Sequence, residues 1–402
     1  MVLKLHNTLG GQLEEFKPIE SGLVKMYHCG PTVYDRAHIG NLRAYVFADI
    51  LRRTLEYVGY EVEQVINITD VGHLTSDADT GDDKMVKGLK REGLPLTLEG
   101  LKTLADKYTG AFVDDLEALN IKMPSHLPRA TEYLAQEIEL IKQIEANGYA
   151  YQLADGIYFD TSKLATYGAL GGLTPLRDIE SRVDASGKRS PRDFVLWKLS
   201  SNDKLGFESP WGKGFPGWHI ECSAMSRSLL GQPFDIHTGG IDHIPVHHNN
   251  EIAQSEAAFG TKLANFWLHN EFVRLNDGKM AKSEGSGVNL DTLVAEGFTP
   301  LDYRYLLLMT HYKSPINFTY EALGAAQSAL SKLKNFVSKV PFDTQGEVNE
   351  DYKEQFMAKL ENDLNTAQAL AVVWTLVKDK EVSPEDKKAT LLDFDKVLGL
   401  GL

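Results

Sequence analysis

The spacing of apolar and polar positions predicts a strand, a helix and a second strand near the start of the chain. Residues 23–29 are mostly apolar and run into Gly30-Pro31, which is typical of a strand that ends in a turn. From 41 to 58 apolar residues recur every three to five positions, and Gly59 is a suitable C-cap, so this stretch predicts a helix. Residues 60–69 predict the next strand, and such a unit is right-handed with parallel strands.

The pattern changes several times farther along the chain. Residues from about 95 to 150 have a helical period, whereas 150–212 combine glycine, proline and short strand signals, which indicates an insertion between two halves of one sheet. Strand signals return at 234–237 and 265–270. Beyond Thr319 the chain is helical: residues 356–377 predict one amphipathic helix, and Ser383-Pro384 predicts the start of another.

Composition narrows the class of protein. The chain has 402 residues and a net charge of −14, so a general nucleic-acid coat is excluded, although a local basic groove is compatible with it. Two cysteines rule out a disulfide-stapled secreted scaffold and favour a reducing compartment. No targeting segment is evident, and the apolar stretch 364–377 is too short to span a bilayer. We therefore expect a soluble, cytoplasmic protein without a membrane partner.

Two segments carry residues suited to phosphate chemistry. Residues 31–41 follow a predicted strand and open a helix, whose N-terminus favours an anion; His38 could bind phosphate oxygens and Gly40 would allow close approach. The alternative is a simple strand-to-helix turn with an incidental histidine. In residues 277–283, Lys279 and Lys282 could stabilise a pyrophosphate leaving group, or they could belong to a solvated lysine-rich turn.

Two further segments offer metal ligands and a nucleoside site. Cys29, Cys222, His247 and Glu251 form a plausible tetrahedral zinc set, because a histidine and a carboxylate at i and i+4 share one helix face. The alternative is that both thiols are buried apolar groups and that the nearby histidines (His237, His243 and His248) are structural. Gly239-Gly240 and Asp242 at a strand end could seat an adenosine, with the carboxylate on the ribose.

Together these segments resemble a known family. The sequences 38–41 (HIGN) and 279–283 (KMAKS) are similar to the two signature motifs of class I aminoacyl-tRNA synthetases, with Asn41 and Ala281 replacing the usual histidine and serine. The flanks at 27–35, 217–223 and 247–255 resemble cysteinyl-tRNA synthetases in particular, and the likeness runs from about residue 20 to the end.

The resemblance implies an α/β fold: a doubly wound, Rossmann-like parallel-sheet catalytic domain, split by a connective insertion and followed by an α-helical C-terminal domain. The expected boundaries are 1–112 and 213–284 for the two catalytic halves, 113–212 for the insertion, 285–340 for a stem-contact-type helical region and 341–402 for an acidic helical bundle. Members usually continue into a further anticodon-recognising domain, and residues 341–402 hold only seven basic against thirteen acidic side chains. We therefore expect that domain to be missing here.

The resemblance also assigns roles. It implies one Zn²⁺ per chain on Cys29, Cys222, His247 and Glu251; catalytic roles for His38, Asn41, Lys279 and Lys282; binding of ATP with Mg²⁺ by Thr32, His38, Gly40, Gly239, Gly240, Asp242 and Lys282; and contacts to L-cysteine from Thr32, Trp218 and His237. The expected partners are tRNA(Cys), L-cysteine and ATP, and the expected state is a monomer.

The expected reaction is activation of cysteine to cysteinyl-adenylate and transfer to tRNA(Cys), with zinc selecting the substrate thiolate over the serine hydroxyl. Two alternatives remain open at this point. One is a ligase that joins cysteine to a small amine, such as the amino-sugar of mycothiol synthesis. The other is a non-catalytic paralogue that acts as a binding or regulatory protein.

Overall fold

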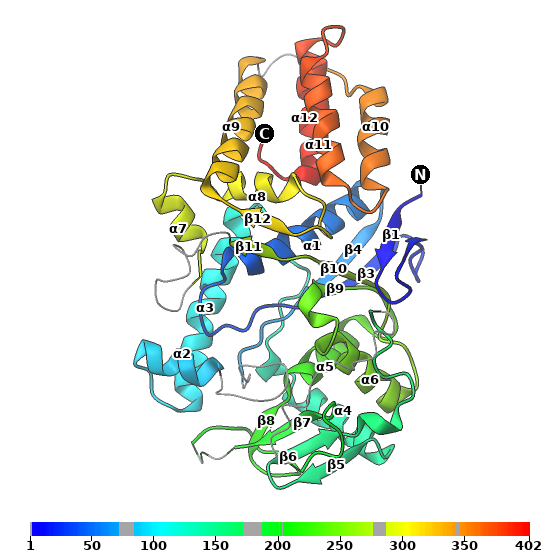
Figure 1. Cartoon of the computed structure of the whole chain (residues 1–402), viewed down its shortest axis with the longest axis vertical. Helices are drawn as coiled ribbons and strands as arrows, with labels where there is room; N and C mark the ends of the chain where they lie inside the picture. The colour runs from blue at the N-terminus through cyan, green and yellow to red at the C-terminus, as the bar shows by residue number, and fades with distance from the viewer. Residues whose placement is uncertain are drawn as a thin grey trace.

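The computed structural model of the chain describes residues 2–71, 84–171, 187–200, 202, 204–275, 287–341 and 346–402. A bundle of helices stands at one end of the molecule and a small antiparallel sheet at the other, with a parallel sheet between them (Figure 1). Lys279 and Lys282 lie outside the described residues, so the roles expected for them stay predictions.

The centre of the molecule is a four-stranded parallel sheet in the order β10-β9-β3-β4. Its strands are β3 (Leu23–His28), β4 (Glu61–Ile66), β9 (Phe234–Gly240) and β10 (Ala264–Asn270). Helix α1 (Ile39–Tyr57) connects β3 to β4, which confirms the predicted strand–helix–strand unit. Because Met26 in β3 pairs with Ile236 in β9, the two halves of the sheet come from distant parts of the sequence.

Helix α1 begins two residues earlier than its apolar period indicates. The imidazole of His38 caps the helix by accepting a hydrogen bond from the backbone N–H of Asn41, and the Asn41 side chain accepts from the backbone N–H of His38. This reciprocal cap satisfies backbone donors that would otherwise have no partner. At the other end Gly59 has a φ of 101°, a conformation that favours glycine.

The chain between the two halves of the sheet folds into helices and a second sheet. The helices are α2 (Lys84–Glu92), α3 (Leu98–Ala118) and α4 (Leu134–Ala146), with a 3₁₀ turn η1 at Ala130–Glu132. The antiparallel strands are β5 (Ala150–Leu153), β6 (Gly156–Phe159), β7 (Phe194–Leu199) and β8 (Gly214–Pro216), with η2 at Thr161–Lys163. The expected boundary between residues 112 and 113 falls inside α3, and the domain boundaries stay predictions.

Helices cover both faces of the parallel sheet (Figure 1). On one face α1 packs through Phe47, Leu51 and Leu55 against β3, β9 and β10. On the other face lie α5 (Trp218–Leu230) and α6 (His247–Phe259), through Cys222, Met225 and Ile252 among others, with η3 at Ile241–His243. This is a doubly wound arrangement, as expected, and it puts the two connections that flank the β3–β9 pair on opposite faces.

The C-terminal part joins the sheet to the helical bundle. The joining elements are β11 (Val273–Leu275), β12 (Ile316–Phe318), α7 (Leu290–Ala295) and α8 (Pro300–Leu308), and the bundle consists of α9 (Tyr320–Lys339), α10 (Glu350–Leu360), α11 (Thr366–Lys378) and α12 (Pro384–Leu398). One apolar core runs from α1 and α3 through α8 into these four helices. Ser383 caps α12 with Pro384 at its first position, as its sequence predicts.

The prediction of one amphipathic helix over 356–377 is wrong. The chain breaks between α10 and α11, where Asp363 and Leu364 have φ values of 58° and 55°. The Asp363 carboxylate accepts hydrogen bonds from the His6 backbone N–H (2.8 Å) and the Tyr312 hydroxyl (2.6 Å). Asn365 then caps α11. This turn is therefore stabilised by contacts with residues distant in the sequence, and the local spacing of apolar residues gives no sign of them.

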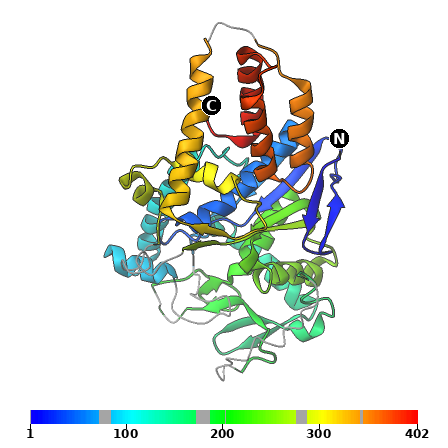
Figure 2. The same ribbon diagram turned by 45° about the horizontal axis from the view of Figure 1, so that its top comes forward.

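An N-terminal hairpin made of β1 (Lys4–Asn7) and β2 (Gln12–Glu15) lies beside α10 (Figure 2). The Lys4 backbone N–H donates to Glu361 O at 2.8 Å, so the hairpin helps to stabilise the turn between α10 and α11. Within the described ranges, none of the helices combines the length and the apolar character that a bilayer crossing requires.

Candidate active site

A cavity of about 460 Å³ opens at the carboxyl ends of the central strands. Its walls come from the chain that follows β3, from the N-terminus of α1, and from residues 270–273 after β10. In open α/β sheets, ligands bind at this edge, between two strands whose connections run to opposite faces. The residues that the sequence singles out can therefore be sorted by their place in this cavity: its floor, its rim or outside it.

Four potential metal ligands meet in a buried layer beneath the cavity, which we call its floor, and one of them, Cys29, also lines the cavity. Cys29 follows β3, Cys222 lies on α5, and His247 and Glu251 lie one turn apart on α6. One ligand atom from each residue lies within 4.8 Å of the other three, and all four side chains are buried. The structure thus brings together the complete set that was expected from the sequence.

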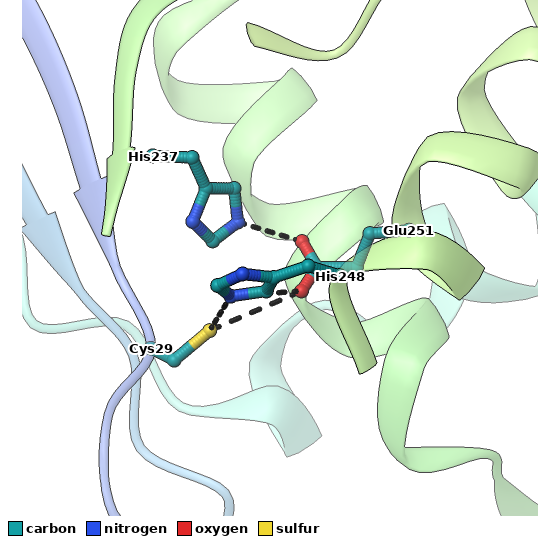
Figure 3. Close-up of side chains that lie close together, drawn as sticks. All are labelled: Cys29, His237, His248 and Glu251. Atoms are coloured by element: carbon teal, nitrogen blue, oxygen red, sulfur yellow. Dashed lines mark hydrogen bonds and ion pairs between the residues drawn. The ribbon is translucent and has the colours of Figure 1, made fainter. Parts of the chain in front are cut away.

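The two carboxylate oxygens of Glu251 have different surroundings. Oε1 lies 2.9 Å from Nε2 of His247 and 3.9 Å from Sγ of Cys29, so it faces the other donors. Oε2 lies 2.7 Å from Nε2 of His237 (Figure 3). The His237 ring in turn stacks on Trp267. One oxygen is therefore directed into the cluster, while an outer histidine holds the other, a common arrangement around metal-ligating carboxylates.

A second group of donors overlaps the first. Cys29, His237, His248 and Glu251 also meet the 4.8 Å limit (Figure 3). In this group Nε2 of His248 lies 3.3 Å from Cys29 Sγ, and Nδ1 lies 2.7 Å from His269 Nε2. The set that includes Cys222 has two thiols, the softer ligands that zinc favours, and leaves His237 and His248 as supports.

The electrostatics of the floor favour a bound cation. Burial lowers the pKa of His247 well below its usual range, so the imidazole is neutral, as a ligand must be. Burial, reinforced by the neighbouring Cys222, raises the pKa of Cys29, and burial also raises the pKa of Glu251. A bound divalent cation would stabilise the deprotonated forms of these buried acidic groups and so offset the free-energy cost of their burial. The donor set therefore fits a metal ion.

The N-terminus of α1 forms part of the rim. His38, Gly40 and Asn41 all line the cavity, and the His38 and Asn41 side chains are exposed. A Cβ on Gly40 would come within 3.0 Å of the His38 ring, so glycine keeps this capping arrangement free of strain. The helix end presents the positive end of its dipole to the cavity, a suitable environment for a phosphate.

The two glycines at the end of β9, Gly239 and Gly240, have different surroundings. Gly240 and Asp242 line the cavity, where a ribose was expected. Gly239 faces the histidines of the floor: a Cβ there would lie 2.6 Å from Nδ1 of His243 and 2.8 Å from Cε1 of His248. Gly239 therefore allows close packing of the rings beneath the cavity.

Two of the three residues expected to contact cysteine line the cavity, and the third does not. Thr32 and Trp218 line the cavity, and the Trp218 ring lies 4.1 Å from that of His247, which connects the wall to the metal donors. His237 lies behind Glu251 and does not line the cavity. Its contacts are those of a support for the donor set.

Several supporting residues were not assigned a role from the sequence. Nδ1 of His219 lies 2.8 Å from Nδ1 of His247, and His269 connects His248 to the Thr8 hydroxyl, 2.8 Å away. The only signal available for His269 is its position near the end of a predicted strand. Its pairing with Gly239 of β9, which places it beside the donors, depends on the sheet register.

Comparison with known proteins defines the class. The chain matches a family model of the class I (C) tRNA synthetase catalytic domain over residues 15–328 and a DALR domain model over 355–402. A solved structure of Mycobacterium tuberculosis methionyl-tRNA synthetase in complex with methionyl-adenylate superposes with a TM-score of 0.60 at 18% identity, covering 94% of this chain and 90% of that one. The fold is that of a class I aminoacyl-tRNA synthetase.

Curated relatives narrow the family. The cysteine–tRNA ligase 1 of Burkholderia lata is 51% identical, with 100% of this chain and 85% of the relative covered. The cysteine–tRNA ligase of Treponema denticola is 46% identical, with 100% and 87% covered. The chain belongs to the cysteine–tRNA ligase family of class I aminoacyl-tRNA synthetases.

Proposed function

We propose that this protein activates L-cysteine with ATP and Mg²⁺ to cysteinyl-adenylate and transfers the cysteinyl group to the 3′ end of tRNA(Cys). The observation that carries the proposal is a buried set of two thiols, a histidine and a carboxylate that reaches the cavity through Cys29, while the HIGN helix start lines the rim of the same cavity. Family membership supports the same reaction.

We propose zinc as the metal at the floor, held by Cys29, Cys222, His247 and Glu251. When bound, zinc would supply a soft Lewis acid that takes the substrate sulfur as a thiolate, a bond that a serine hydroxyl matches poorly. Around it, His237 orients the Glu251 carboxylate, and His248 contacts the Cys29 sulfur. Size alone discriminates weakly between two side chains that differ by one atom, so we assign cysteine selection to this set.

We propose that the rim binds the nucleotide. The positive end of the α1 dipole and the His38 ring would face phosphate oxygens, and Gly40 would allow close approach. Asp242 beside Gly240 would accept hydrogen bonds from the ribose. Asn41, Lys279 and Lys282 would stabilise charge on the phosphates, and Thr32 and Trp218 would contact the bound amino acid.

The chemistry then consists of two displacements without a protein nucleophile. The cysteine carboxylate attacks the α-phosphorus of ATP and pyrophosphate leaves; the terminal ribose hydroxyl of the tRNA then attacks the activated carbonyl carbon and AMP leaves. The residues of this chain contribute by holding the reacting groups close together and by stabilising developing charge. We further propose a cytoplasmic monomer with the domain boundaries expected from the sequence.

The decisive experiment has two arms. Cysteine-dependent exchange of pyrophosphate into ATP should be observed, with serine giving little exchange, and purified tRNA(Cys) should become charged with cysteine. Exchange without tRNA charging would favour a cysteine ligase for a small amine, and the absence of any exchange would favour a binding protein. Charging of an acceptor-stem minihelix, compared with full tRNA, would show how far recognition depends on the acceptor end.

A further inference from the structure

Arg43 is a buried charge that lies outside both the donor set and the helix cap. It lies on α1, one turn beyond Gly40, and its side chain is only 3% exposed. The guanidinium donates to four backbone carbonyls on two separate segments. They are Phe272 O (2.7 Å), Ser314 O (2.6 Å), Tyr312 O (3.1 Å) and His311 O (3.3 Å).

No carboxylate among the described residues forms an ion pair with this guanidinium. Burial lowers the pKa of Arg43 to about 10, so the group stays charged at neutral pH. Burying a charge without an ionic partner is costly, and an apolar side chain of similar length would avoid that cost. The planar fork of arginine, however, can bind several carbonyls in fixed directions at once, which favours a positioning role.

The carbonyls that Arg43 binds lie on two segments that run side by side at the start of the parallel β11–β12 pair. Phe272 O also accepts from the Ile316 backbone N–H at 3.0 Å, and Tyr312 O accepts from the Glu271 backbone N–H at 2.9 Å. Residues 270–273 form one wall of the cavity, and His38, Gly40, Asn41 and Ala44 at the start of α1 form another. Arg43, which does not itself line the cavity, therefore connects two of its walls through hydrogen bonds.

A second tie lies nearer the mouth of the cavity. The backbone N–H of Ile39 donates to Val288 O at 2.8 Å, and the Tyr303 hydroxyl donates to Ile39 O at 2.7 Å. The start of α1 is therefore held to the chain at 288 and to α8. Arg43 makes no hydrogen bond or ion pair with the metal donors at the floor, so its contacts bear on the nucleotide end of the cavity.

We propose that Arg43 is a positioning residue for ATP: it fixes the separation between the α1 wall and the wall formed by residues 270–273, and thereby sets nucleotide affinity and the rate of adenylate formation. This proposal rests on the proposed function. Displacing reacting groups by about 1 Å can reduce a rate by about 100-fold, so a small change in wall separation has a measurable effect.

The test compares Arg43→Lys and Arg43→Met with Arg304→Lys. Lysine keeps the charge but has one point-like ammonium, which reaches fewer carbonyls than the fork does. Arg304 is a matched control because it is fully buried and donates to Leu398 O (2.7 Å) and Leu119 O (3.0 Å), as well as to Asp49, and none of these residues lines the cavity. All variants are measured by cysteine-dependent exchange, zinc content, cysteine binding and thermal unfolding.

We expect Arg43→Lys to reduce kcat/KM for ATP by about 10- to 100-fold, with zinc content and cysteine affinity unchanged. Arg304→Lys should lower the unfolding temperature and leave the KM for ATP unchanged. The proposal is overturned if folded Arg43→Lys keeps wild-type ATP kinetics, or if ATP and cysteine binding weaken together. Should Arg43→Met fail to fold, the lysine variant alone decides. A wild-type protein without exchange would instead refute the proposed function.

Discussion

The floor and the rim of one cavity are built in opposite ways. At the floor, Cys222, His247 and Glu251 are at most 1% exposed, and neighbouring side chains hold the donor groups. At the rim, His38 and Asn41 are exposed, and their order comes from a reciprocal cap with the helix backbone. The donor groups of the floor depend on tertiary contacts, whereas the local order of His38 and Asn41 comes from the helix cap.

This difference corresponds to two kinds of recognition. A metal site that selects a thiolate must exclude water and fix its ligands, because affinity depends on ligand count and geometry. A phosphate site at a helix N-terminus gains from backbone donors that are present in any helix start, and it must stay open to large substrates. Changes at the floor should therefore affect cysteine selection, and changes at the rim should affect the nucleotide.

The largest effect is expected for Cys222→Ser. Removing one of two thiolates from the proposed set should abolish zinc binding and reduce cysteine-dependent exchange below detection. Mutating even an outer partner of a metal ligand lowers metal affinity or activity by about 10- to 100-fold, and loss of a ligand itself should cost more. Zinc content and exchange with cysteine and serine provide the measurements. Ser228→Ala on the same helix, where the hydroxyl donates to Ala224 O, serves as the control. Retention of zinc and of cysteine preference by Cys222→Ser would refute the metal assignment.

His38→Ala should have the next largest effect and should act on the rim alone. Loss of a group that stabilises phosphate charge typically costs about 100- to 1,000-fold in rate. We expect exchange to fall in that range while zinc content stays at one per chain. Because His38 also caps α1, His38→Asn is the companion variant: asparagine caps helices well but lacks the ring. If His38→Asn restores full exchange, the histidine acts only as a cap.

A smaller effect at the floor is expected for His237→Phe. The phenyl ring can still stack on Trp267, but it removes the contact to Glu251 Oε2. Zinc affinity should weaken by about 10- to 100-fold, as measured by competition with a chelator, and the KM for ATP should not change. His237→Gln, which keeps a polar group near the carboxylate, should recover part of the affinity. Equal zinc affinity in all three proteins would contradict the supporting role.

The smallest effect concerns the ion pair behind the rim. Burial raises the pKa of Asp115 to about 6, although Arg36, which lines the cavity, lies 3.1 Å away and opposes the shift. In the unfolded chain the same carboxyl titrates at about 3.9. The protonated carboxyl therefore contributes fully to the stability of the folded protein below that pH, and this contribution is lost as the pH rises through 6.

Asp115→Asn should therefore stabilise the protein relative to wild type at pH 7.5 and give little difference near pH 4.5. The expected gain in the free energy of unfolding is below about 3 kcal/mol, since each pKa unit corresponds to about 1.4 kcal/mol. Urea unfolding at the two pH values measures it. A difference that is independent of pH would show that the carboxyl does not titrate as described.

Local sequence was sufficient for the elements whose determinants are close together. The period of α1, the turn after β3 and the Ser383-Pro384 start of α12 all lie within a few residues, and each forms as expected. Long-range contacts decided the rest. The helix expected over 356–377 breaks because His6 and Tyr312 bind the carboxylate of Asp363.

For the site, the sequence by itself determined which residue types were available: two thiols, a histidine one turn before a glutamate, and a helix start suited to phosphate. The tertiary structure decided how they are used. The sheet and the helices packed on it bring Cys29 close to α6, with one Glu251 oxygen toward the donors and the other toward His237. The packing of α1 against residues 272 and 311–314 places Arg43 behind the cavity wall. Distances between such remote residues depend on the packing of the whole sheet, which no local pattern specifies.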